Sequence, residues 1–100
     1  MAEIFTIEKF EGHKDTKFLM HYGDSKTAEL VLTSVRDVGS SDRQQQFSLV
    51  FLGPLDAPVA QGSFRVDHAA LGSLDLFLVP IARDNSGISY EAIFNRMVEP

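Results

Sequence analysis

The sequence contains no cysteine among its 100 residues. This absence excludes disulfide bonds, iron–sulfur clusters, zinc sites with thiolate ligands and cysteine nucleophiles. No apolar run approaches the ~20 residues of a membrane-spanning helix. Residues 1–5 also lack the basic and apolar regions of a signal peptide. We therefore expect no transmembrane segment, no membrane partner and, by default, a cytoplasmic location.

Positive charge is scarce, with nine Lys and Arg residues against fourteen acidic ones and a formal net charge of −5. The longest basic cluster is Lys14 and Lys17 beside His13, and Asp15 interrupts it. Nucleic-acid binding depends on a local excess of Lys and Arg that contacts phosphates. We therefore expect no nucleic-acid partner.

Motifs for catalysis and for phosphate binding are absent as well. There is no G-x-S-x-G nucleophile elbow, no G-x-x-x-x-G-K-[ST] loop and no G-x-G-x-x-G loop. His13, His21 and His68 do not have the i, i+4 spacing of helical metal ligands. The sequence predicts no catalytic residues, no metal and no cofactor, and favours a protein that is not an enzyme.

His68 is the single weak site candidate, because it leads into a bend at Leu71-Gly72. We interpret it as a histidine at a strand end that bonds the backbone of the bend. A ligand-binding or catalytic role is the alternative. Asp67 precedes it, but neighbouring strand residues point to opposite faces, so the two form no dyad.

What the sequence has is apolar and β-branched material for one core, with 44% hydrophobic and 23% charged residues. These values are typical of a soluble globular chain, and the length suits a single domain over residues 1–100. A short N-terminal helix ends near Gly12. Period-two alternation between turn signals then predicts strands over 16–22, 27–38, 47–52, 64–68, 74–82 and 88–95. The fold class is mainly β, a six-stranded antiparallel meander that forms a small barrel or a strongly curled sheet.

Two of these strands carry apolar residues on both faces. On strand 47–52, the apolar residues of the second face are Val50 and Leu52. On strand 74–82, they are Phe77 and Val79, which lie opposite the leucine face. A strand buried on one face alternates more cleanly, so something must cover the second face. The helix can cover part of it, and a protein partner or a second copy can cover the rest. Pro80 lacks an N–H group and should lie at an edge or a bulge.

Glu91 and Asn95 share a face of the last strand, beside aromatic residues. They fit either a recognition surface or ordinary sheet surface. Arg65 and Asp75 are expected to pair across the Leu71-Gly72 hairpin.

Three segments carry a resemblance: FSLVFLGP at 47–54, GSFRVDHAALGSLDLFLVP at 62–80 and YEAIFN at 90–95. Together they resemble a family of small bacterial domains of about 100 residues and unassigned function. The resemblance implies a bacterial source and an accessory place in a phage-tail-like or fibre assembly, and it supplies no catalytic residue.

The sequence thus favours a non-catalytic interaction or assembly module that binds a protein partner or itself. Its candidate surface is Val50, Leu52, Phe77, Val79, Glu91 and Asn95. The alternative is a small-ligand-binding β-barrel, although six strands enclose an interior that side chains fill.

Overall fold

The computed structural model describes residues 7–39 and 44–97, which form one short helix followed by six strands. The elements are α1 (Ile7–Glu11), β1 (Lys17–Tyr22), β2 (Lys26–Asp37), β3 (Gln44–Gly53), β4 (Gly62–His68), β5 (Gly72–Asp84) and β6 (Gly87–Met97). No helix in this part of the chain has the length and apolar character that a membrane crossing requires.

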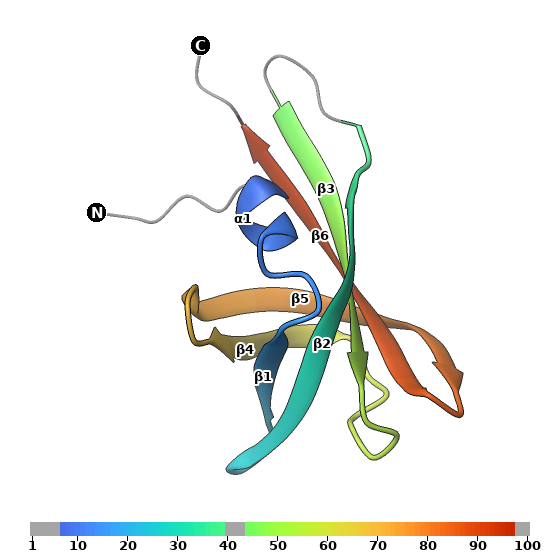
Figure 1. Cartoon of the computed structure of the whole chain (residues 1–100). Coiled ribbons are helices and arrows are strands. Elements are labelled where there is room, and N and C mark those ends of the chain that lie inside the picture. Colours follow the sequence, from blue (N-terminus) through green and yellow to red (C-terminus); the bar gives the residue numbers. More distant parts are fainter. Residues whose placement is uncertain (1–6, 40–43, 98–100) are drawn as a thin grey trace.

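The six strands close into a barrel in the order β1-β2-β3-β6-β5-β4, and every neighbouring pair is antiparallel (Figure 1). The predicted mainly-β fold, with six antiparallel strands and one short N-terminal helix, is confirmed. The strand order differs from a plain meander at one connection, because β3 pairs with β6 and not with β4. Two three-stranded meanders, β1–β3 and β4–β6, are therefore joined along two seams.

The loop 54–61 makes this order possible, because it carries the chain from the end of β3 to β4 on the other side of the barrel. Pro54 and Pro58 leave no tight hairpin turn between the two strands. Ala57 is 5% exposed, and the Tyr90 hydroxyl donates a hydrogen bond to the Pro58 carbonyl. The loop is thus packed against the barrel end that it crosses.

Alternation along the strands builds the core inside the barrel. On β5, Leu74, Leu76 and Leu78 are buried, whereas Phe77 is 54% exposed. The other strands contribute buried residues to the same interior: Phe18, Met20, Leu30, Leu32, Phe47, Leu49, Phe51, Val66, Ile88, Tyr90 and Ala92. Side chains therefore fill the barrel, as expected for a barrel of six strands.

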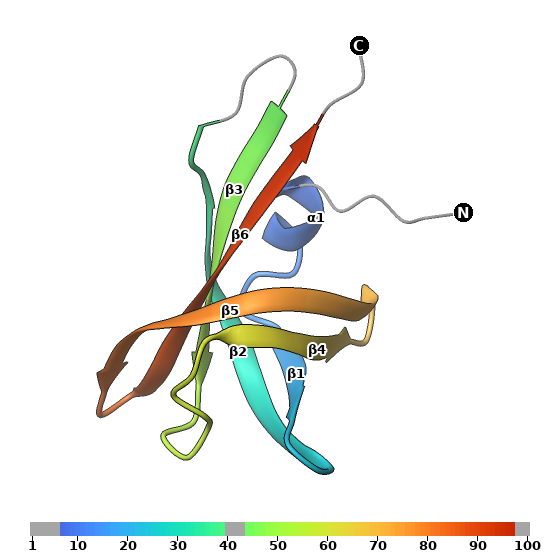
Figure 2. The same cartoon turned by 180° about the vertical axis from the view of Figure 1, so that it is seen from behind.

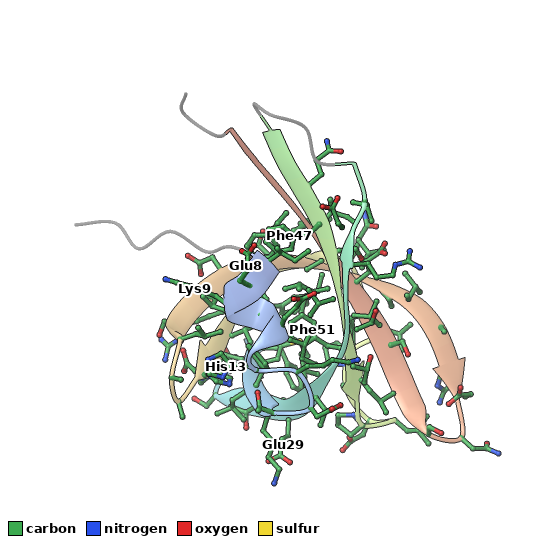
Figure 3. The ribbon with its side chains drawn as sticks, turned by 45° about the horizontal axis from the view of Figure 1, so that its top comes forward. Glu8, Lys9, His13, Glu29, Phe47 and Phe51 are labelled. Atoms are coloured by element: carbon green, nitrogen blue, oxygen red, sulfur yellow. The ribbon has the colours of Figure 1, made fainter. Side chains whose placement is uncertain are left out.

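Helix α1 lies between the β3–β6 pair and the β4–β5 pair (Figures 1 and 2). The Phe10 ring, which is fully buried, contacts the rings of Phe47 and Phe94 at centroid distances of 5.8 and 5.2 Å. Figure 3 shows Phe47 and Phe51 on the side of α1 that faces β3. The helix therefore covers the barrel interior. The expectation that it covers part of the second face of β5 is wrong, because Phe10 anchors it on inward-facing rings.

The position of Pro80 agrees with the sequence prediction of a bulge. A closed barrel has no free edge, and the register between β5 and β6 shifts between Pro80 and Ala82. Ile81, which the shift places in the bulge, is 51% exposed.

Candidate functional site

The outward-facing residues of β3, β6 and β5 form the apolar surface that we call the outer face: Val50, Leu52, Phe77, Val79, Glu91 and Ile93. Strand register creates its centre, because Glu91 on β6 lies opposite both Val50 on β3 and Val79 on β5. Directly opposite residues in antiparallel strands have Cβ atoms about 4.5–5.5 Å apart. Three segments far apart in the sequence thus meet in one row.

Two side chains of the outer face are unusually open to solvent. Ile93 is 58% exposed and Phe77 is 54% exposed, while Val50, Leu52 and Val79 are half-buried. A single exposed apolar side chain needs no explanation, but apolar side chains gathered over neighbouring strands mark an interaction surface. The outer face is therefore the candidate functional site.

One charged group lies within this surface. The Glu91 side chain is half-buried, and its Oε2 atom accepts a hydrogen bond of 2.8 Å from the Ser48 hydroxyl. Ser48 is only 2% exposed, although it lies between the inward-facing Phe47 and Leu49. The hydrogen bond is therefore largely shielded from water at its Ser48 end, and it fixes the position of the carboxylate.

Most of the residues predicted for an interaction surface come together. Val50, Glu91 and Val79 share one row, Leu52 lies opposite Ser89 on the adjoining strand, and Phe77 extends the face along β5. Asn95 is in β6, opposite Gln46, but its side chain lies outside the described residues.

Ile93 is the residue that the sequence interpretation missed. The alternation of the strand could have identified it. Ile93 lies between Ala92 and Phe94, which alternation places on the inward face, so Ile93 must point outward.

His68 bonds the bend as predicted. Its Nδ1 atom accepts hydrogen bonds from the backbone N–H groups of Ala70 and Leu71, at 3.0 and 3.2 Å. The proton of the neutral ring is therefore on Nε2, which donates to the Thr16 hydroxyl at 2.9 Å. Thr16 in turn donates to the His13 carbonyl at 2.5 Å. Nδ1 thus holds the bend that follows β4, and Nε2 ties β4 to the segment between α1 and β1.

The surroundings keep His68 in this neutral form. Its ring centroid lies 4.3 Å from that of Phe18 and 4.7 Å from that of His13. Burial lowers the pKa of His68, and the positive charge of a protonated His13 lowers it further. Through these contacts His68 positions the bend after β4 against the segment that leads into β1.

A polar cluster lies on the outside of β1, β4 and β5, centred on Asp67. Its carboxylate accepts hydrogen bonds from Arg65, Ser73 and His21, with the His21 Nε2 atom 2.6 Å away. Hydrogen bonds from Arg65, then Ser73 and then His21, hold the pKa of Asp67 well below its usual range. Arg65 lies opposite Asp75 across the hairpin, as expected. Within the described part of the chain, however, the hydrogen bonds and the ion pair of Arg65 go to Asp67, so the expected ion pair with Asp75 does not form.

A pocket of about 420 Å³ adjoins this cluster at the seam where β1 pairs with β4 over three residue pairs only. Its lining comes from Lys17, Phe18, Leu19, Glu29, Asp67, His68 and Ala69. Across residues 7–39 and 44–97, no three His, Asp or Glu side chains converge as a metal ion requires.

Comparison with known proteins defines the family and nothing further. No curated protein and no solved structure matches the chain. A family model matches residues 5–94, which is nearly the whole chain and includes every residue of the outer face. The chain therefore belongs to the family described as Domain of unknown function (DUF6916).

Proposed function

We propose that the protein is a non-catalytic interaction module that docks a partner protein on its outer face. The observation that carries this proposal is the row of Val50, Glu91 and Val79 across three strands, with Phe77 and Ile93 more than half exposed beside it. Apolar surface of this kind gains free energy when a partner removes it from water.

Closure of the barrel supports the use of a face. A partner can extend a sheet by adding a strand to a free edge, but each of the six strands already has two neighbours. Docking through side chains of the outer face therefore fits this fold better than strand addition. For the setting of this role we propose the cytoplasm and an accessory place in a phage-tail-like or fibre assembly, as the family resemblance implies.

Copurification tests the proposal. The tagged protein, produced in its own cell, is expected to recover a stoichiometric partner that sizing with light scattering detects as a complex. Phe77→Lys should abolish the complex, because it replaces the large exposed apolar side chain of the outer face by a charged one. Thr27→Lys on the exposed part of β2 is the matched control and should retain it. A strictly monomeric wild type without partner, or a complex that survives Phe77→Lys, contradicts the proposal.

Binding of a small ligand is the second candidate function, and the pocket at the β1–β4 seam favours it. Its volume of about 420 Å³ is within the range of known ligand sites. A ligand of this pocket should raise the melting temperature of the wild type but not that of Leu19→Trp, whose larger side chain fills the space. An equal rise in both proteins would show that the ligand binds elsewhere.

A further inference from the structure

The charge of Glu91 constrains what can cover the outer face. Its lateral neighbours Val50 and Val79 are aliphatic and offer no positive charge. Among the described residues no Lys, Arg or His lies within ion-pair distance of its carboxylate. The Ser48 hydroxyl bonds the Oε2 atom, which leaves the Oε1 atom open for a donor from outside the chain.

A purely apolar partner would therefore be a poor fit. It would remove water from the half-buried carboxylate without returning an opposite charge, and an uncompensated buried charge strongly weakens binding. A partner that places a cation over Glu91 avoids this loss. Aliphatic side chains on both sides of that cation would match Val50 and Val79.

A second copy of the chain meets this requirement poorly. The formal net charge of −5 makes two copies repel each other, and a two-fold contact centred on the row would bring two Glu91 carboxylates together. The charge pattern favours a different, basic partner. Arginine suits the position best, because its planar guanidinium offers several donors to a carboxylate and is enriched in protein interfaces.

Resting on the proposed docking function, we infer that the partner is a protein segment that presents an arginine between apolar side chains, with its guanidinium on Glu91. The apolar flanks contact Val50 and Val79, and Ser48 keeps the carboxylate in place for the guanidinium. The same surface accepts a lysine less well, because an ammonium group is more strongly hydrated.

A matched pair of peptides tests this inference. The probes are Ac-Gly-Ser-Leu-Arg-Leu-Ser-Gly-NH2 and the same peptide with citrulline, the neutral isostere of arginine, in the central place. Nuclear magnetic resonance follows the amide signals of Ser48, Val79, Glu91 and Ile93 while each peptide is added to the whole chain. The arginine peptide should bind about two- to fivefold more tightly, the range expected for a partly exposed ion pair.

Two variants separate a local effect from general attraction. Glu91→Gln should remove the difference between the peptides. Glu29→Gln, on β2, deletes the same charge from a side chain that is ion-paired with Lys17, and it should leave the difference unchanged.

Each other outcome overturns the inference in a recognisable way. Equal binding of both peptides to the wild type would show an apolar docking face without preference for a cation, and the proposed function would survive. Equal effects of Glu91→Gln and Glu29→Gln would show that the preference for the arginine peptide comes from the net charge of the chain and not from Glu91. If neither peptide shifts the four signals, the inference fails, and copurification with Phe77→Lys decides the docking function separately.

Discussion

The Ser48 hydroxyl donates a hydrogen bond of 2.8 Å to the Glu91 carboxylate, and this contact joins β3 to β6 on the outside of the barrel. The two residues are 43 positions apart in the chain. Ser48 is 2% exposed, so its hydroxyl has little access to water and depends on Glu91 for a partner. The contact therefore both stabilises the pair of strands and fixes the charge at the centre of the outer face.

Replacing Ser48 by alanine should lower the free energy of unfolding by about 1 kcal/mol, the usual net worth of one hydrogen bond. Urea denaturation followed by circular dichroism measures the change. Ser63→Ala, on the exposed surface of β4, is the control and should stay within ~0.5 kcal/mol of the wild type. Equal effects of the two variants would show that the Ser48–Glu91 bond contributes nothing measurable.

Phe10→Ala should destabilise the fold by about 3–5 kcal/mol, because it removes a buried ring from the end of the barrel. The variant loses the contacts of Phe10 with Phe47 and Phe94, which hold α1 over the interior. Denaturant unfolding gives the change. Glu8→Ala on the exposed side of the same helix should be nearly neutral. A loss below ~1 kcal/mol for Phe10→Ala would mean that α1 does not close the barrel.

Two glycines with positive φ should respond differently to alanine. Gly87 has a φ of +139°, and an added Cβ would lie 2.1 Å from the Gly53 carbonyl oxygen, so we expect Gly87→Ala to cost about 3 kcal/mol or more. Gly72 has a φ of +81° but nothing within 4 Å, so Gly72→Ala should cost only the conformational strain of about 1–2 kcal/mol. Similar melting temperatures for the two variants would contradict the close approach of Gly87 to β3.

The neutral state of His68 predicts a pH dependence of stability. Its folded-state pKa is lowered, whereas the unfolded histidine titrates near 6.5. Between these two values the unfolded chain binds more protons than the folded one, so the free energy of unfolding rises with pH. The stability that the neutral His68 contributes is complete above about pH 6.5 and decreases as the pH falls below it. Denaturation at pH 7.5 and 5.5 measures this slope.

His68→Asn is the matched variant for that measurement, because asparagine still offers an acceptor to the bend but does not titrate. The wild type should lose more stability than His68→Asn between pH 7.5 and 5.5. Parallel pH profiles would show that protonation of His68 is not linked to folding.

The strands and the core could be predicted from the sequence because alternation is a local signal. The leucines of β5, the exposed Phe77 and the bulge at Pro80 all follow from residue type and spacing over a few positions. The order of the strands did not follow, because the pairing of β3 with β6 depends on which seams close the barrel. Nothing near Pro54 in the sequence specifies that choice.

The candidate site could be predicted only in part, because the register between distant strands is not a local signal. Period two placed Val50, Val79 and Glu91 on outward positions, but only the register brings them into one row. Contacts between distant segments were missed entirely. His21 bonds Asp67, a residue 46 positions away, and no local pattern indicates this contact.

The most direct test of the docking surface is photo-crosslinking in the cell that produces the protein. A benzophenone amino acid replaces Ile93, which is 58% exposed on the outer face, or Thr27, which is exposed on β2. The account predicts one discrete adduct with a different protein from position 93 and none from position 27. No adduct from position 93, or the same adducts from both positions, would contradict it.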